Sequence, residues 1–272
     1  NNLLYRVKMK LLYGKAYKVI AISSGLKNFL VSELGVDPNK IEVILNPCNI
    51  RLISKLSNEP LNDEEERIFK HVVLLSVGRL AYEKGQWHLI RAFKLVSEKD
   101  PSARLVIIGE GPLRGYLEKL IMDLGLSGKV HLLGWKPNPF KYMARSFLLC
   151  FPSLLEGLGN VIIEALACGL PVMSSDCLSG PREILAPGTE YKIGKLRRAE
   201  YGEYGILMPI MDGKLYSATD PLTWREKVWA DEIVRLLRNP EILEEYRRKG
   251  PQRATDFDIS KIIPKYFSVF DE

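Results

Sequence analysis

Two glutamates, Glu156 and Glu164, bracket a turn that contains two glycines and follows an apolar segment. The segment 147–151 predicts a strand, and the segment 160–168 predicts a helix that ends at Gly169. In an open α/β sheet, ligands bind at the carboxyl ends of the strands. A helix that begins there presents free N–H groups and a partial positive charge to an anion. The pattern therefore indicates an anion site flanked by carboxylates, and the alternative is an ordinary connection with two solvated glutamates.

Other loops that follow predicted strands carry cations, glycines or an aromatic ring. They contain Arg79 with Lys84, the glycine-rich run 109–112, Trp135, and the run 179–181. Because the carboxyl ends of parallel strands share one edge of a sheet, we expect these loops to lie together. Cations and helix N-termini suit a phosphate group, and a carboxylate can accept from two sugar hydroxyls. The sequence thus predicts a nucleotide-linked anion as ligand, and no aspartate pair predicts a divalent metal.

Strands alternate with helices along most of the chain. We predict strands at 72–77, 104–108, 130–133, 147–151, 172–175 and 205–209, with helices between them. This alternation predicts βαβ units and a doubly wound, Rossmann-like parallel sheet of the α/β class. The longer polar stretch 186–204 is predicted to be a loop.

The first 48 residues read as the end of a domain rather than as a complete one. They predict a basic amphipathic helix over 1–18, a strand at 18–23, a helix over 25–34 capped by Ser24, and a strand at 41–45. Two strands make a poor parallel sheet by themselves. We therefore expect a chain that lacks the beginning of its first domain.

Composition is that of an ordinary globular protein. Of the 272 residues, 46% are hydrophobic and 26% are charged. The formal net charge of +6 favours anionic partners such as phosphorylated molecules or lipid surfaces, and no nucleic-acid-binding motif is present. No apolar run reaches the length of a transmembrane helix. The four cysteines show no metal-ligand spacing, and their use fits a reducing cytoplasm.

Taken together, these motifs resemble the family 4 retaining glycosyltransferases of the GT-B fold. The residues that carry the resemblance are Gly78-Arg79-Leu80, Glu83-Lys84-Gly85, Gly109-Glu110-Gly111-Pro112, Glu156-Gly157-Leu158-Gly159 with Glu164, and Ala167-Cys168-Gly169-Leu170-Pro171-Val172. The two glutamates match the family's E-x7-E element. The resemblance is strong over roughly residues 72–212 and weaker elsewhere.

The resemblance implies roles for these residues. Arg79 and Lys84 would grip the donor diphosphate and stabilise the departing nucleoside diphosphate without a metal. Glu164 would hold the ribose, and Glu156 would orient the donor sugar without serving as a nucleophile. The implied catalytic residues are Glu156, Arg79 and Lys84; the implied donor-binding residues are Gly78, Arg79, Lys84, Gly109, Gly111, Trp135, Lys136, Glu156, Gly157, Leu158, Gly159, Asn160, Val161 and Glu164. Trp135 and Lys136 would lie against the base.

It also implies a division of the chain. Residues 1–48 would be the tail of an incomplete N-terminal acceptor domain, 49–70 a linker, 71–256 the nucleotide-sugar donor-binding domain, and 257–272 a helical tail that returns to the N-terminal domain. The implied reaction is metal-independent, retaining transfer of a hexosyl or N-acetylhexosaminyl group. The donor would be a UDP-sugar and the acceptor a glycan or a lipid-linked glycan. The basic first helix suggests work at the cytoplasmic face of a membrane.

Several alternatives stay open beside this interpretation. A glycosidase with paired carboxylates is rejected, because Glu156 lies in a loop and Glu164 in the following helix, so that they bracket a turn rather than face each other across a cleft. A GT-B sugar-nucleotide epimerase would need acid and base residues from both domains. A non-catalytic nucleotide-sugar-binding fragment fits the incomplete first domain. A basic binder of membranes or nucleic acid would leave the glycine-rich loops unexplained.

Overall fold

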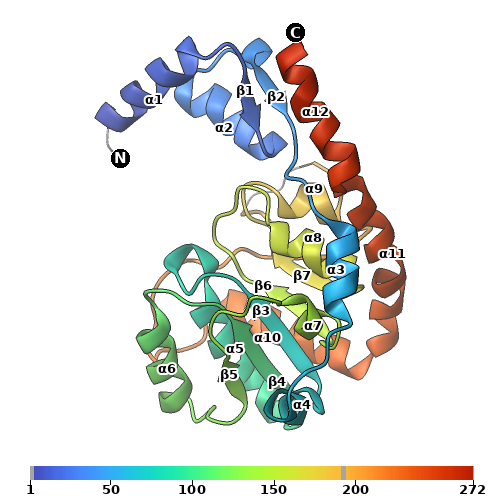
Figure 1. Ribbon diagram of the computed structural model, residues 1–272. Helices are drawn as coiled ribbons and strands as arrows, with labels where there is room; N and C mark the ends of the chain where they lie inside the picture. The colour runs from blue at the N-terminus through green and yellow to red at the C-terminus, as the bar shows by residue number, and fades with distance from the viewer. Residues whose placement is uncertain (1–2, 191–193, 272) are drawn as a thin grey trace.

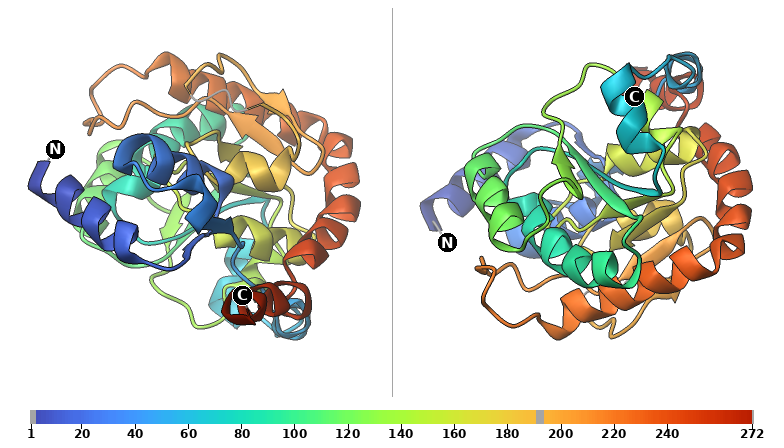
Figure 2. Two further views of the ribbon diagram at one scale, coloured as in Figure 1. Left: turned by 90° about the horizontal axis from the view of Figure 1, so that it is seen from above. Right: turned by 90° about the horizontal axis from the view of Figure 1, so that it is seen from below.

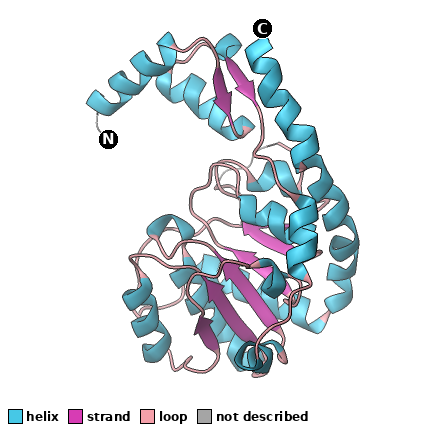
Figure 3. Cartoon of the chain, in the orientation of Figure 1, coloured by secondary structure: helices cyan, strands magenta, loops and turns pink. Residues whose placement is uncertain are grey.

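The computed structural model describes residues 3–190 and 194–271 and contains two separate sheets (Figures 1 and 3). The smaller sheet pairs β1 (Val19–Ala21) with β2 (Ile41–Val43) in parallel. We call residues 3–47 together with the last helix, α12 (Ile259–Asp271), the first lobe. The remaining residues form the second lobe. Residues 1–2 of the predicted first helix, 191–193 of the predicted loop and 272 of the predicted tail lie outside the described residues.

The second lobe is built on a seven-stranded sheet in the order β5-β4-β3-β6-β7-β9-β8. All neighbours pair in parallel except β8 and β9, which are antiparallel. The predicted parallel α/β sheet is therefore confirmed. The strands are β3 (Val73–Val77), β4 (Arg104–Ile108), β5 (Val130–Leu132), β6 (Leu148–Phe151), β7 (Val172–Ser175), β8 (Glu200–Tyr201) and β9 (Ile206–Met208).

Chain order reverses between β3 and β6, which lie side by side with Leu74 opposite Leu148. From β3 the chain builds β4 and β5 on one side, and from β6 it builds β7 and β9 on the other. Crevices open at such a reversal, because the connections on its two sides run to opposite faces of the sheet. The loops after β3 and β6 therefore flank the most favourable ligand position in the second lobe.

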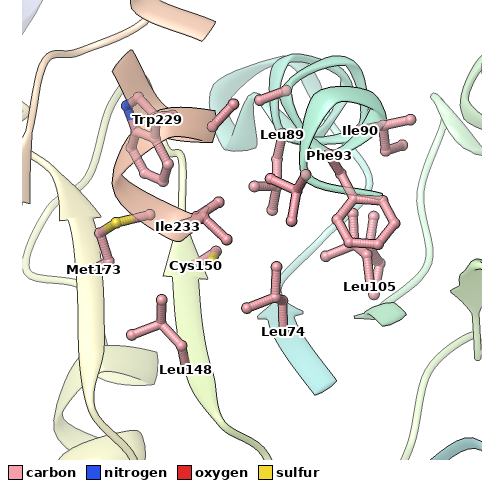
Figure 4. Close-up of a cluster of buried hydrophobic side chains, with 14 of the residues drawn as sticks. Leu74, Leu89, Ile90, Phe93, Leu105, Leu148, Cys150, Met173, Trp229 and Ile233 are labelled. Atoms are coloured by element: carbon pink, nitrogen blue, oxygen red, sulfur yellow. The ribbon is translucent and has the colours of Figure 1, made fainter. Parts of the chain in front are cut away.

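Helices cover both faces of the large sheet (Figure 2). One face carries α5 (Gln86–Lys99), α6 (Arg114–Asp123) and α10 (Trp224–Arg238); the other carries α7 (Phe140–Met143), α8 (Asn160–Ala167), α9 (Pro181–Leu185) and α11 (Glu244–Ala254). Successive strand residues point to opposite faces. Leu74 thus belongs to the cluster that includes Phe93 of α5 and Trp229 of α10 (Figure 4), whereas Leu75 belongs with Ile162 to the cluster on the other face.

The structure adds to or corrects several predicted elements. The segment 49–70, for which no helix was predicted, contains α3 (Ile50–Ser57) and α4 (Asp63–Phe69), each started by an asparagine cap. Its role as a linker between domains stays a prediction. The predicted loop 186–204 contains β8, whose two residues are too few for a periodic signal. The first lobe's second helix, α2 (Ser24–Leu34), is capped by Ser23 rather than by Ser24. The helix α1 spans Leu3–Lys15.

The polypeptide joins the two lobes at two adjacent segments. The backbone N–H of Cys48 donates to the carbonyl of Phe257 at 2.8 Å, and the N–H of Ile259 donates to the carbonyl of Cys48 at 3.0 Å. Beyond this junction α12 packs Ile262 and Val269 against Ile44 of the first lobe. Among the described residues, no helix is both long enough and apolar enough to span a membrane.

Candidate functional site

The loops after β3 and β6 meet through an ion pair. Lys84, at the end of the short 3-10 helix Tyr82–Lys84, places its Nζ 2.5 Å from Oε1 of Glu156. The side chains are only 20% and 9% exposed. The same Nζ lies 5.4 Å from the centre of the Phe151 ring, at the end of β6. A cation and a carboxylate are thus held together at the point where the strand order reverses.

Two glycines let the loop after β3 pack against the loop after β4. A Cβ on Gly109 would lie 2.0 Å from the carbonyl oxygen of Gly78, and one on Gly111 would lie 2.4 Å from that of Leu80. The N–H of Gly78 donates to Ile108 at 2.9 Å, and the N–H of Leu80 donates to Glu110 at 2.9 Å. The structure brings these predicted residues to one edge. In this structure the glycines serve the packing of one loop on the other.

The loop after β6 is held by the loop after β7. A Cβ on Gly180 would lie 1.9 Å from the carbonyl oxygen of Leu158, so the two backbones touch. The hydroxyl of Ser179 donates to the carbonyl of Glu156 at 2.6 Å and lies 3.1 Å from that of Gly157. The N-terminus of α8 follows directly, after Gly159 in a left-handed conformation with φ +88°. These contacts therefore hold the backbone of Glu156 against the loop that follows β7.

Glu164 lies apart from Glu156 and lines a separate cavity beside α8. This cavity, of about 150 Å³, is lined by residues of α8 and of the junction between the lobes, including Asn46, Cys48 and Asn160. Burial raises the pKa of the Glu164 carboxyl. Burial, followed by the nearby Glu164 carboxylate, also raises the pKa of the Cys48 thiol to about 12. The two glutamates of the E-x7-E element thus face different spaces.

Three other predicted side chains, those of Arg79, Trp135 and Lys136, line neither this cavity nor the cavity at the Lys84–Glu156 pair. Arg79 is 65% exposed and pairs with Glu83 at 2.5 Å, and this hydrogen bond lowers the pKa of the Glu83 carboxyl. Trp135 is 71% exposed. The ammonium of Lys136 lies 3.1 Å from Oε1 of Glu65, on α4. The structure therefore does not bring Arg79 or Lys136 into contact with the Lys84–Glu156 pair.

A cavity of about 440 Å³ lies at the Lys84–Glu156 pair and is walled by both lobes. Its polar wall belongs to the second lobe and includes Lys84, Glu156 and Ser179. Its apolar wall includes Leu26 and Phe29 of α2. The sequence did not predict these two residues as part of the site, because α2 meets the second lobe only in the folded chain. The complete lining is Gly25, Leu26, Phe29, Glu83, Lys84, Leu155, Glu156, Gly157, Leu178 and Ser179.

Within residues 3–190 and 194–271, no group of histidine, cysteine, aspartate and glutamate side chains is arranged to hold a metal ion. The cavity presents the paired ammonium of Lys84, the carboxylates of Glu156 and Glu83, the hydroxyl of Ser179 and backbone groups as its polar chemistry. Such a set can bind a phosphate and orient hydroxyl groups.

Residues 44–194 match the family described as "Glycosyl transferases group 1". The match covers more than half of the chain and includes both loops that carry Lys84 and Glu156. This chain belongs to the glycosyl transferase group 1 family. The predicted glycosyltransferase resemblance is thus confirmed at the level of this family.

Relatives of this group 1 chain are named glycosyltransferases. An uncharacterized glycosyltransferase of Methanocaldococcus jannaschii is 41% identical over 262 residues, covering 94% of this chain and 64% of the relative. The N-acetylgalactosamine-N,N'-diacetylbacillosaminyl-diphospho-undecaprenol 4-alpha-N-acetylgalactosaminyltransferase of Campylobacter jejuni is 31% identical, covering 96% of this chain and 62% of the relative. The chain thus spans a little under two thirds of the length of these relatives.

Solved structures show the same fold. Anabaena HepE, in complex with UDP and glucose, superposes with a TM-score of 0.78 at 22% identity, over 98% of this chain and 67% of that one. S. aureus TarM superposes with a TM-score of 0.73 at 22% identity, over 98% of this chain and 46% of that one. The predicted GT-B type of α/β fold is therefore confirmed for this glycosyl transferase group 1 chain.

Proposed function

We propose that the cavity at Lys84 and Glu156 binds the diphosphate and sugar of a nucleotide-sugar donor, and that the chain takes part in retaining glycosyl transfer from it. One observation carries the proposal. A buried ammonium–carboxylate pair lies at the reversal of a doubly wound sheet, inside a cavity of about 440 Å³. When a ligand binds, the cation can pair with its phosphate and the carboxylate can accept hydrogen bonds from its hydroxyl groups.

The donor we propose is a UDP-sugar. Support comes from HepE, whose structure was solved with UDP and glucose on the same fold. Glu164, in its own cavity beside α8, would accept hydrogen bonds from the ribose hydroxyls. Trp135 would lie against the base, which its exposed ring permits. Lys136 would need to leave Glu65 to do the same.

The chemistry needs no protein nucleophile. As the bond between the anomeric carbon and the phosphate oxygen breaks, negative charge grows on the departing diphosphate, and Lys84 stabilises it. Arg79 can join by turning from Glu83, because its side chain is largely exposed. In a same-face substitution the departing phosphate oxygen takes the proton of the acceptor hydroxyl. Glu156 meanwhile orients the sugar.

The acceptor we propose is a glycan or a lipid-linked glycan, without a further cofactor or metal. The name of the Campylobacter relative includes such a lipid-linked substrate. Lys8, Lys10 and Lys15 are exposed on α1 together with Leu11 and Leu12, which suits contact with an anionic membrane surface at its cytoplasmic face. Sedimentation with and without anionic vesicles would test this contact.

Calorimetry tests the binding site directly. The chain should bind UDP more tightly than GDP or a short DNA duplex, and Lys84→Ala should weaken UDP binding at least tenfold. Lys119→Ala is the matched control, since Lys119 is an exposed lysine of α6 that pairs with Asp123 away from the cavity. Tighter binding of DNA than of either nucleotide would contradict the proposal.

A non-catalytic donor-binding role is the second candidate. The observation in its favour is that the paired cation and carboxylate of the cavity suffice to bind a donor whether or not transfer follows. Turnover of a UDP-sugar by this chain, compared with a version extended to the relatives' full length, separates the two functions. Equal turnover would exclude the non-catalytic role.

A further inference from the structure

The first lobe touches the second through the N-terminus of α2. The backbone N–H groups of Ser24 and Gly25 donate to the two carboxylate oxygens of Glu183, at 3.0 and 3.1 Å. Ser23 caps the next free amide by accepting from Leu26 at 3.1 Å. The first amides of a helix have no partner within the helix. Here a side chain of α9 in the other lobe supplies that partner, with a negative charge that favours the positive end of the helix.

Gly25 makes this contact close. A Cβ at this position would lie 2.4 Å from the Cβ of Ser179 and 2.7 Å from the carbonyl oxygen of Leu178. Both distances are far below ordinary van der Waals contact. The lobes can therefore approach this closely only because residue 25 has no side chain.

Ser179 carries the contact to the candidate site. Its hydroxyl donates to the carbonyl of Glu156, and the Glu156 carboxylate holds Lys84. Direct contacts thus run from Gly25 through Ser179 and Glu156 to Lys84. Displacing α2 would remove the packing on Ser179 and loosen the backbone that aims the Glu156 carboxylate.

The backbone around Glu183 is held in place by bonds to the rest of the second lobe. Its neighbour Arg182 is buried and pairs with Asp176 at 2.7 Å and with Glu200 at 2.7 Å. Arg253 of α11 donates to the carbonyl of Glu183 at 2.7 Å. Because α9 is anchored on the second lobe by these bonds, the Glu183 carboxylate determines where the N-terminus of α2 sits.

We propose that Glu183 is a positioning residue for the donor site. It holds α2 against the segment 178–180, and Gly25 and Ser179 transmit that position to the backbone of Glu156. The effect on donor binding rests on the proposed function, whereas the contact between the lobes does not. Loss of the Glu183 carboxylate should therefore loosen the loop 156–160 and weaken donor binding, although Glu183 does not line the cavity.

Hydrogen exchange and calorimetry with UDP test the proposal on the same samples. In Glu183→Ala, the amides of Ser24 and Gly25 should exchange at least tenfold faster, the loop 156–160 should lose protection, and the Kd for UDP should rise about fivefold or more. Glu183→Gln keeps one acceptor oxygen and should give intermediate values. Glu98→Gln, at a surface pair on α5, should change neither measurement.

Gly25→Ala tests the same contact without touching Glu183. Alanine favours the helix but its Cβ forces α2 away from Ser179, so loop 156–160 should lose protection here as well. Gly115→Ala is the matched control, because a Cβ on Gly115 in α6 meets no atom within 4 Å. Unchanged protection of 156–160 in both Glu183→Ala and Gly25→Ala would overturn the inference. If the unaltered chain failed to bind UDP, the proposed function would fall, while the exchange data would still decide the role of Glu183.

Discussion

Lys84 Nζ and Glu156 Oε1 lie 2.5 Å apart, although 72 residues separate them in the chain. The pair spans the two loops that flank the reversal of the large sheet. Because both side chains are mostly buried, neither charge is well solvated, and each depends on the other. A ligand phosphate can therefore bind Lys84 only where a hydroxyl or another donor compensates Glu156. This coupling favours a ligand that carries both groups, as a nucleotide-sugar does.

The first prediction concerns this coupling. Lys84→Met should leave the Glu156 carboxylate without its cation and lower the free energy of unfolding by roughly 2 kcal/mol. Adding Glu156→Gln should recover part of that loss. Urea unfolding of both single variants and the double variant gives the coupling free energy, which we expect to be about 1–3 kcal/mol. Additivity of the two single effects would contradict the pairing.

The second prediction concerns the loops after β3 and β4. Gly109→Ala should lower the free energy of unfolding by roughly 3 kcal/mol, because the new Cβ would lie 2.0 Å from the Gly78 carbonyl oxygen. The backbone also has φ +147°, which suits glycine. Thermal and urea unfolding measure the loss. Gly115→Ala should leave the free energy of unfolding unchanged or raise it. If both changes had the same effect, the close contact at Gly109 would not be the cause of the loss in stability.

The third prediction concerns Glu65, which is 5% exposed and anchors α4 on α7. Burial raises its pKa, but hydrogen bonds from Tyr142, Lys141, the Asn62 N–H and Lys136 outweigh burial and lower the pKa to about 2. A group whose folded pKa is depressed stabilises the protein above its unfolded pKa, which is about 4.3 for glutamate. That stability should be lost as the pH falls from about 4.3 to 2.

The loss at Glu65 should be roughly 2–3 kcal/mol. Unfolding by urea at a series of pH values between 2 and 6 measures it. Glu65→Gln should be less stable at neutral pH and should show a flatter dependence on pH across this range. A variant whose pH dependence matched that of the unaltered chain would rule out this carboxylate as the cause.

The fourth prediction concerns a buried charge network between α5 and the first turn of α10. Glu226 accepts from Nε of Arg91 at 2.9 Å and lies 2.8 Å from Nδ1 of His88, with all three side chains buried. Burial raises the pKa of the Glu226 carboxyl, and the bonds from His88 and Arg91 outweigh it and lower the pKa. Glu226→Ala should lower the free energy of unfolding by about 3–5 kcal/mol, because Arg91 loses its buried counter-charge.

Glu118→Ala provides the comparison for Glu226. Glu118 pairs with Arg114 at 2.8 Å on the exposed surface of α6, where such a pair contributes at most about 1 kcal/mol. Urea unfolding at neutral pH should rank the two variants clearly. Similar losses would mean that burial does not set the strength of these pairs.

Local patterns predicted most strands of the second lobe. The strands β3, β4, β6 and β9 are short apolar runs followed directly by a glycine or proline, and these signals depend only on neighbouring residues. The same patterns did not predict the helices α3 and α4 or the two-residue strand β8. The edge shared by Lys84 and Glu156 followed from the rule that parallel strands end together. The partner of Lys136 did not follow, because Glu65 reaches it through the packing of α4, which no local pattern encodes.

The part of the cavity wall that the first lobe contributes could not be predicted from the sequence either. Gly25 and Phe29 line the cavity only because α2 docks on the segment 178–180, at a separation of about 150 residues. No local pattern in the sequence marks Glu183 as part of the site. Its carboxylate gains a task only when the N-terminus of α2 arrives from the other lobe.

The junction at Cys48 and Phe257 has a mechanical consequence. A single flexible tether would let the first lobe twist, slide and bend relative to the second. Here two backbone segments run side by side from one lobe to the other and are joined by hydrogen bonds at 2.8 and 3.0 Å. Such a pair resists twist and shear much more than bending. Any movement of the first lobe relative to the second must therefore bend both segments together.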